Sequence, residues 1–447
     1  MGTDHQAIAI VGMLLLAPLA IAGLLRPFFG LLALITIYFV QPGELFPALA
    51  ALHIERTYAL ALLAAFFMQR ESADDRSMLH PIVRAGVAMV GVCLLSVPFA
   101  IWKGGALDST VNLAKLIIYT FLLSTLIDSQ DRMRKVLWVL VGMLAWVTGY
   151  GFISYLQGDY IVRQGIDRAE GGTSIVGGPN ELAGIILLLL PLVVALWRCT
   201  ERVLLRLLLL GVMLCSLATM VVTGSRAGFI GLGLVTLYYI LHSRHKAAGL
   251  AVCVSAAVIL WLAMPQQYQN RYFTTVHYAQ GDQLDGSNEL RVQLWKAGWR
   301  MFLDHPILGV GAGQYSTAYG MQYSGRAHGA WMNPHSLFFQ VASELGLVGL
   351  VAVGYFIYLL VKTDRFLLRF YSESPEHIEH QIALALGACL LSVGLNSIFG
   401  HSLYRPQWYF TAGLLAASCR LAEAIPQAVN SSAEQVTSGL GLPTLAS

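Results

Sequence analysis

The stretch "NPHSLFFQVASELGLVGL", Asn333 to Leu350, opens an apolar segment that continues to about residue 361. An apolar run of about 20 residues is long enough to cross the hydrocarbon core of a bilayer as a helix. Yet Pro334 and His335 stand at its start, and Glu344 lies inside it. Ionisable groups in membrane segments are costly and are commonly functional. The stretch therefore predicts a membrane-spanning helix with chemistry at its beginning.

Similar apolar segments recur along the chain. The 447 residues are 56% hydrophobic and 12% charged, whereas soluble domains carry roughly 25% charged residues. We predict an all-α fold, a polytopic transmembrane helical bundle of roughly 12 or 13 spans. The expected spans are residues 7–25, 28–46, 54–69, 82–101, 110–128, 136–156, 180–197, 204–222, 226–242, 248–264, 336–361, 381–400 and 407–422.

The amino-terminal flank, the net charge and the cysteines bear on the class of membrane protein and on its ligands. The flank "MGTDHQ" carries no basic residue and no cleavage site follows, so the first span is expected to be a retained helix. The net charge is +3 without a run of Lys or Arg, which argues against a nucleic-acid partner. The six cysteines lie in or beside apolar segments and show no metal-binding or disulfide spacing. We expect no metal and no cofactor.

Basic residues collect in alternate short loops, which predicts that those loops lie in the cytoplasm. The segments expected outside are 102–109, 157–179, 223–225, 265–335 and 401–406, and an odd span count also puts the amino terminus outside. The predicted organisation is transmembrane helices over 1–264, a long outside loop over 265–335, transmembrane helices over 336–423 and a disordered tail over 424–447.

The long outside loop contains a helical pattern followed by a turn. Leu294, Ala297, Met301 and Phe302 recur at helical spacing, which predicts an amphipathic helix lying along the membrane surface. The "GVGAGQY" after it lacks the glycine spacing of a dinucleotide site, and we interpret it as a turn.

Three residues of the outside half are the main candidates for catalysis. Arg226 stands at the turn "TGSRAG" between two spans, Arg291 heads the loop helix and His335 begins the next span. A guanidinium suits phosphate oxygens in two-pronged contacts. With Asn333 as helix cap and Pro334 as first helical residue, His335 lies in the first turn, where the helix dipole favours a neutral imidazole that can accept a proton. The alternatives are snorkelling arginines and an interfacial histidine without a role.

Four further residues are candidates for substrate binding. Arg163 adds to a positive field outside, together with Lys103, Arg168 and Arg405. Lys115 stands within an apolar run and is expected to point inward. Asn180 follows the glycine-rich "GGTSIVGGP", where helix packing is the alternative function. Glu344 faces a different side of its helix from His335, and its alternative role is to bond a neighbouring helix.

Several blocks together resemble the O-antigen ligase and polymerase superfamily of bacterial envelope proteins. They are "GGPNELAG", "TGSRAG", "LRVQLWKAGWRMFLDHPILGVGAGQY" and "NPHSLFFQVASELGLVGL", within residues 170–362. The resemblance implies a metal-independent membrane glycosyltransferase, in the inner membrane with a periplasmic site, that uses a glycan on undecaprenyl pyrophosphate. It also implies that Arg226 and Arg291 hold the pyrophosphate and that His335 activates the acceptor hydroxyl.

The resemblance leaves the acceptor open. It is lipid A–core for ligases, a lipid-linked repeat for polymerases of O-antigen, capsule or exopolysaccharide, and a protein hydroxyl for a third branch. A lipid-linked oligosaccharide transporter is the alternative from another class. Transporters commonly show repeated halves with binding at the midplane, whereas this sequence shows no internal repeat and its candidate residues gather at one membrane face.

Overall fold

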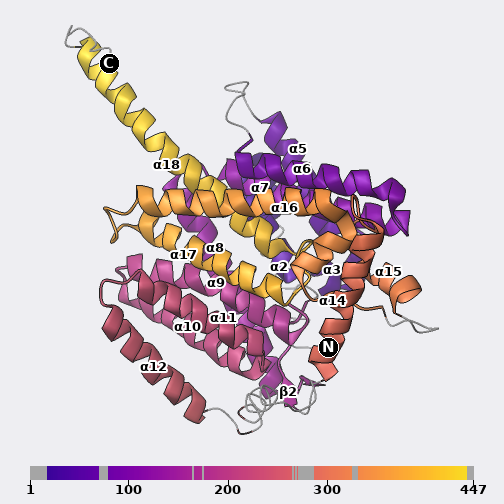
Figure 1. The fold of residues 1–447 in the computed structure, drawn as a ribbon. Helices are drawn as coiled ribbons and strands as arrows, with labels where there is room; N and C mark the ends of the chain where they lie inside the picture. The colour runs from indigo at the N-terminus through magenta and orange to yellow at the C-terminus, as the bar shows by residue number, and fades with distance from the viewer. Residues whose placement is uncertain are drawn as a thin grey trace.

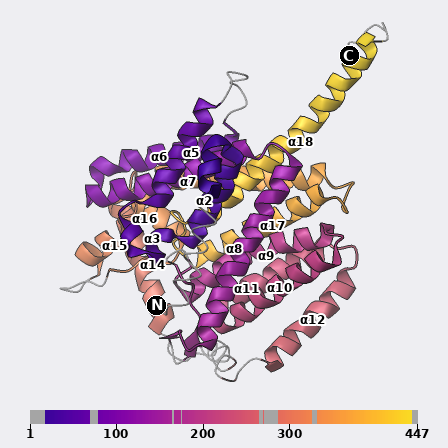
Figure 2. The ribbon, with the colours of Figure 1, turned by 180° about the vertical axis from the view of Figure 1, so that it is seen from behind.

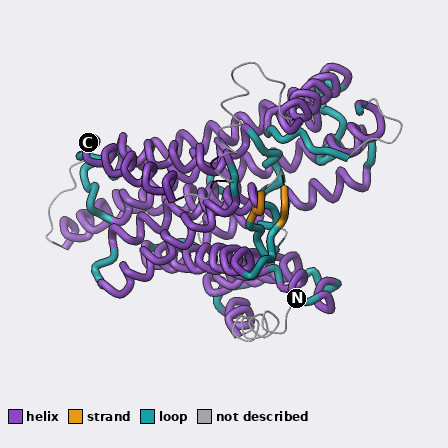
Figure 3. Tube along the Cα trace, turned by 90° about the horizontal axis from the view of Figure 1, so that it is seen from below, coloured by secondary structure: helices purple, strands orange, loops and turns teal. Residues whose placement is uncertain are grey.

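The computed structural model describes residues 18–69, 79–163, 166–173, 176–263, 266, 269, 286–324 and 331–439. Across these residues the fold is helical, apart from one two-stranded antiparallel sheet that lies beside the helix ends (Figure 3). Eight helices are long and apolar enough to cross a membrane. The predicted all-α polytopic bundle is therefore confirmed.

The described helices follow one another along the chain as Figures 1 and 2 show. The first half contains α2 (Pro27–Val40), α3 (Pro42–Leu45), α4 (Pro47–Ala50), α5 (Ile54–Met68), α6 (Pro81–Ser96), the 3₁₀ turn η2 (Val97–Phe99), α7 (Lys103–Leu126), α8 (Gln130–Leu156), α9 (Pro179–Cys199) and α10 (Val203–Thr223). The second half contains α11 (Arg226–Leu241), α12 (Lys246–Ala263), α14 (Gly286–Asp304), α15 (Tyr315–Ala318), the π-helical turn η3 (Tyr319–Tyr323), α16 (Leu337–Phe370), α17 (Ile378–Ile398) and α18 (Pro406–Gly439). The strands are β1 (Ile161–Arg163) and β2 (Ile166–Arg168).

The core is built around α9. In its most apolar window 78% of the residues are buried, against 22% for its neighbour α10. Helix α9 packs against α8, α10, α11 and α17, and these contacts need a surface that is apolar all round. Helix α10 turns Leu204, Leu207 and Leu208 outward. An exposed leucine row on a helix of this length is the surface expected to face lipid.

Fewer helices qualify as spans than the sequence predicts. The predicted spans 54–69 and 226–242 correspond to α5 and α11, which have 15 and 16 residues, short of the roughly 20 that a bilayer core requires. The predicted span 28–46 corresponds to Pro27–Glu44, which is one of the eight although the backbone turns left-handed at Gln41 between α2 and α3. The helices over the predicted spans 248–264 and 407–422 are not among the eight. The predicted span 7–25 lies mostly outside the described residues. The count of 12 or 13 is therefore too high for the described part of the chain.

The carboxyl terminus also differs from the prediction. Residues 424–439 were expected to be disordered, but they continue α18, which projects from the bundle (Figure 1). The stretch "AEAIPQAVNSSAEQV" is rich in alanine and glutamate, which favour helix. The remaining tail residues, 440–447, lie outside the described part.

Loops that were assigned to the same side of the membrane gather at the same end of the bundle. Val162, Ser225, His335 and Ser402, from four segments expected outside, line one cavity. Gln130, Ser374 and His377, from segments expected in the cytoplasm, line a separate cleft with Leu421. The grouping agrees with the predicted alternation of the loops.

Candidate functional site

The first of these cavities has a volume of about 760 Å³, within the range of small-molecule sites. It lies where the β hairpin, the starts of α9, α11 and α14, the segment before α16 and the α17–α18 connection meet. Among its charged lining residues in the described part of the chain, positive charge dominates: Arg168, Arg226, Arg291 and Arg405 stand against the single carboxylate Glu181. An excess of guanidinium groups is the environment expected for an anionic ligand.

Arg226 reaches the cavity from a short turn. Gly224, with φ of 55°, ends α10, and Ser225 caps α11 by accepting a hydrogen bond from the Gly228 N–H at 3.2 Å. Glycine at the end of a helix and serine at the start of the next are the residues that such a turn favours. Arg226 is consequently the first residue of α11, which places it on the cavity wall.

Arg291 comes to the same wall from the loop helix α14. Leu294 and Met301 of this helix are fully buried and Ala297 nearly so, while Phe302 is partly exposed. Their partners are Val310, Tyr315 and α16. The predicted amphipathic helix is thus confirmed, but protein covers its apolar face instead of the membrane surface. Burial and the positive charge of Arg226 lower the pKa of the Arg291 guanidinium.

His335 lies in front of α16, and its expected place in the first helical turn is wrong. The helix is capped at Ser336 and begins at Leu337, while His335 has a left-handed backbone with φ of 48°. Histidine visits this conformation more readily than most residues. Trp295 of α14 holds the segment: its Nε1 donates to the Pro334 carbonyl at 2.9 Å, and its indole stacks on Phe339 with a centroid distance of 5.5 Å.

The imidazole of His335 is kept neutral by its surroundings. Burial and the positive charge of Arg291 lower its pKa, while Glu181 acts in the opposite direction. The direction agrees with the prediction from the sequence. Its cause is different, because desolvation and a neighbouring arginine take the place of the helix dipole.

A buried arginine connects three of the segments that line the cavity. Arg168 is 4% exposed, and its Nε donates to the Thr223 carbonyl at 2.7 Å. Its terminal nitrogen donates to Asn180 Oδ1 at 3.0 Å. Arg168 therefore links the hairpin, the start of α9 and the turn that carries Arg226. The sequence placed Arg168 only within a general positive field.

The predicted substrate-binding residues divide between the cavity and other parts of the molecule. Asn180 lines the cavity. Arg163 lies in β1, paired with Ile166, and its role stays a prediction. Lys115 is placed differently from the prediction, since its Nζ lies 3.1 Å from Glu55 Oε1, to which the Tyr119 hydroxyl also donates at 2.7 Å. Lys115 points inward as expected, but towards an acid between helices, which is a structural role.

Glu344 also bonds neighbouring segments instead of lining the cavity. It is 3% exposed, and its Oε2 accepts from the Gly313 N–H at 2.9 Å and from the Tyr404 hydroxyl at 3.0 Å. The "GVGAGQY" turn, as predicted, is a turn, and it docks on α16 through Val310 N–H to the Ser343 carbonyl at 2.8 Å. Glu344 thus ties this turn and the α17–α18 connection to α16, which is the structural alternative for this residue.

The docking of this turn depends on a break in α16. Gly346 has φ of 62° and ψ of −154°, a conformation open essentially to glycine alone. The break allows the Leu347 N–H to donate to the Pro306 carbonyl at 2.8 Å. A Cβ at Gly346 would lie closer to the Ile307 carbonyl oxygen than real Cβ contacts allow. The close contact at Gly346 is therefore with the backbone of Pro306 and Ile307, before the turn.

We expect Gly346→Ala to destabilise the protein by at least about 2 kcal/mol, because the new Cβ adds strain and displaces the turn. Thermal unfolding in detergent, followed by circular dichroism, measures this effect. Gly354→Ala is the matched control on the same helix, because its Cβ would meet nothing within 4 Å. Equal melting temperatures for the two variants would contradict the role of the break.

His401 is a cavity residue that the sequence analysis missed. It lies in the α17–α18 connection, and its ring centroid is 5.5 Å from that of His335, with the planes at 76°. Burial, Arg405 and His335 lower its pKa to about 3, so the ring is neutral. The histidine of "FGHSLYRP" was the available signal. It was overlooked because only the tertiary fold brings this connection next to residue 335.

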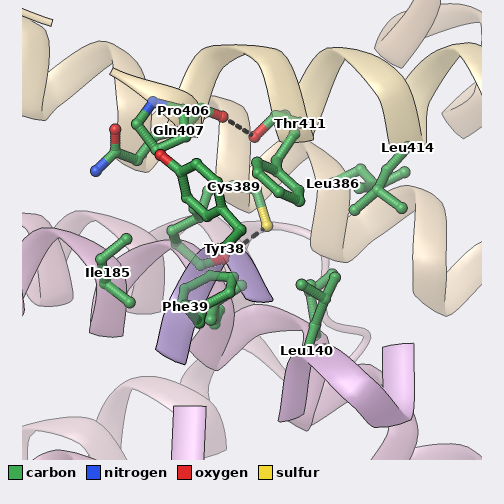
Figure 4. A pocket seen from close by; sticks show the side chains of 14 residues that line it. Tyr38, Phe39, Leu140, Ile185, Leu386, Cys389, Pro406, Gln407, Thr411 and Leu414 are labelled. Carbon is green, nitrogen blue, oxygen red and sulfur yellow. Dashed lines mark hydrogen bonds between the residues drawn. The ribbon is translucent and has the colours of Figure 1, made fainter. Parts of the chain in front are cut away.

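A second cavity close by is apolar and small. It is lined by side chains such as Tyr38, Ile185, Leu386 and Leu414 (Figure 4). Its volume is about 20 Å³, little more than one water requires. Gln407 borders both cavities, so the polar cavity ends where this apolar packing begins.

Comparison with known proteins agrees with these features. Residues 211–354 match the family described as O-antigen ligase, and the match includes Arg226, Arg291 and His335. No curated protein matches the chain. With eight helices long and apolar enough to span a membrane, the molecule is a multi-pass membrane protein. Over this segment, which is less than half of the chain, the protein is similar to the O-antigen ligase family.

Proposed function

We propose that the polar cavity is the active site of a glycosyltransferase that moves a glycan from undecaprenyl pyrophosphate to a hydroxyl acceptor at the periplasmic face. The observation that carries this proposal is the meeting of Arg226, Arg291 and His335 on one cavity. These residues come from three separate segments of the chain, and they supply the two kinds of group that such a transfer requires.

The first requirement is stabilisation of the leaving group. When the bond between the anomeric carbon and the diphosphate oxygen breaks, the electron pair leaves with the diphosphate and its negative charge increases. Fixed cations placed where charge develops lower the barrier because they need no reorganisation. We assign this role to Arg226 and Arg291, because a bound anion offsets the burial and the positive charge of Arg226 that lower the pKa of Arg291.

The second requirement is removal of one proton. The acceptor oxygen forms the new bond to the anomeric carbon, and its proton passes to the neutral imidazole of His335. A base must be uncharged before the reaction, which the lowered pKa of His335 ensures at neutral pH. Glu181 then favours the imidazolium that forms. We propose a single displacement with inversion at the anomeric carbon.

The ligase and polymerase branches share this chemistry, because they use the same leaving group and differ in the hydroxyl that attacks. The proposal favours an enzyme over a transporter, since the cations gather with loops at one end of the bundle, whereas transporter sites commonly lie near the midplane.

A reconstituted system tests the function directly. Purified protein in proteoliposomes is supplied with a polyprenyl-diphosphate glycan, and with lipid A–core or a second lipid-linked repeat as acceptor. We expect a new glycosidic product with one of the two acceptors and release of polyprenyl diphosphate. Movement of the intact donor between leaflets without product would instead support a transporter.

A further inference from the structure

A cavity wall formed by the end of α17, the α17–α18 connection and the start of α18 differs chemically from the wall that carries Arg168, Arg226 and Arg291. It contributes the neutral polar residues Asn396, Ser397, His401, Ser402 and Gln407, and the charged residue that it adds to the cavity lining is Arg405. His401 Nδ1 and Gln407 Oε1 are both buried and have no hydrogen-bond partner among the described residues. A buried polar atom without a partner costs about 1–3 kcal/mol. Both residues line the cavity, so a ligand towards which their side chains turn can supply these hydrogen bonds.

The chemistry of these atoms selects the class of ligand. A carbonyl oxygen accepts hydrogen bonds only, and a neutral imidazole accepts at one nitrogen and donates at the other. Phosphate oxygens have no proton to give to the Gln407 oxygen when ionised. A hydroxyl donates and accepts, so a polyhydroxylated ligand such as a glycan satisfies both residues. The arginine wall suits the diphosphate, and this wall suits sugar.

The wall is rigid enough to recognise a ligand. The Trp408 indole Nε1 donates to Ser397 Oγ at 3.1 Å and to Ser402 Oγ at 3.2 Å. The Leu403 N–H donates to Gln340 Oε1 of α16 at 3.2 Å. These bonds fix the connection on both sides of His401. A binding group held by its surroundings loses little entropy when the ligand arrives.

We propose that His401, supported by Gln407, binds a hydroxyl group of the acceptor glycan beside His335. With the two imidazole rings 5.5 Å apart, a sugar held at His401 presents a neighbouring hydroxyl to His335. His401 is thus a binding residue for the acceptor, and His335 is the residue that takes the proton of the acceptor hydroxyl. The identification of the bound glycan as the acceptor rests on the proposed function, whereas the binding of a glycan by this wall is argued from the geometry alone.

Binding measurements on the full-length protein test the inference without turnover. The probes are inorganic diphosphate, a deacylated lipid A–core oligosaccharide and a released O-antigen repeat. The variants are His401→Phe, which keeps a ring and removes both nitrogens, and Arg291→Met. We expect His401→Phe to weaken oligosaccharide binding at least about tenfold and to leave diphosphate binding unchanged. Arg291→Met is expected to give the reverse pattern.

In the transfer assay, His401→Phe is expected to raise the KM for the acceptor at least about tenfold, with kcat within about threefold and the donor KM unchanged. His401→Asn, which keeps a nitrogen or oxygen near the Nδ1 position, is expected to recover part of the loss. Thermal unfolding of each variant identifies any folding defect, and Gln407→Leu then gives a second test of the wall.

The proposal is overturned if wild-type protein binds neither oligosaccharide, or if His401→Phe leaves oligosaccharide binding intact. It also fails if kcat falls as far as in a His335 variant while the acceptor KM is constant, since His401 would then act through His335. Absence of transfer by wild-type protein contradicts the proposed function, whereas the binding pattern still decides the glycan-binding wall.

Discussion

Replacing His335 by asparagine is expected to lower kcat for glycan transfer by about 10²- to 10⁴-fold, the usual contribution of a general base. Asparagine is the informative replacement because it tolerates the left-handed backbone that His335 adopts, with φ of 48°. Its amide cannot take a proton from a hydroxyl group. The fold and the binding of donor should therefore persist while the proton transfer is lost.

The control for this variant is His305→Asn. His305 follows the end of α14 and is exposed, and it is not among the residues that line the cavity. Its replacement should leave kcat unchanged. Transfer at near wild-type rate by the His335 variant, in protein that melts normally, would remove the assignment of His335 as the base.

The pH dependence provides an independent readout of the same group. A base acts in its neutral form, so kcat/KM should be constant at high pH and fall as the pH decreases through the pKa of His335. Because burial and Arg291 lower that pKa, the fall should occur below the ordinary histidine value of about 6.5. Arg291→Met should move the fall of the residual activity to higher pH.

Replacing Arg226 or Arg291 by methionine is expected to lower kcat/KM by about 10²- to 10³-fold each, the usual effect of removing one group that stabilises developing charge. Methionine keeps the length of the side chain and removes the charge. Lysine should restore only part of the activity, because it lacks the planar fork that binds two oxygens. The transfer assay and the affinity for inorganic diphosphate measure both effects.

The double variant tests whether the two arginines act on one group. Residues that share a ligand are commonly non-additive, so the double variant should lose less than the product of the two single losses. Arg291→Met should not lower the melting temperature, because it removes a partly buried charge that burial and Arg226 disfavour. Arg300→Met, an exposed position nine residues along α14, is the control. If the losses of kcat/KM are fully additive and the affinity for diphosphate is unchanged, the two arginines do not bind one diphosphate together.

Hydropathy was sufficient for the class of fold but not for the number of spans. An apolar run reveals that a segment avoids water, and it does so equally for a lipid-facing helix such as α10 and for a buried one such as α9. It does not reveal where the backbone breaks. The short lengths of α5 and α11 follow from local geometry that hydropathy averages out.

Charge in apolar surroundings was the sequence signal for the candidate site, and the structure places the selected residues differently. Arg226, Arg291 and His335 share a cavity. The same signal selected Lys115, which is partly buried beside Glu55, and Glu344, which is buried and bonds Gly313 and Tyr404. A buried charge is costly in either case, and only its neighbours distinguish a ligand contact from a bond between helices.

The sequence by itself determined that this is a polytopic helical membrane protein with a segment similar to the O-antigen ligase family, because composition and local motifs are properties of short segments. Tertiary structure alone decided that His335 precedes its helix, that Glu344 ties the turn to α16 and that His401 stands beside His335. These facts depend on segments distant in sequence meeting in space. Contacts of that kind are formed by packing, and no local pattern along the chain encodes them.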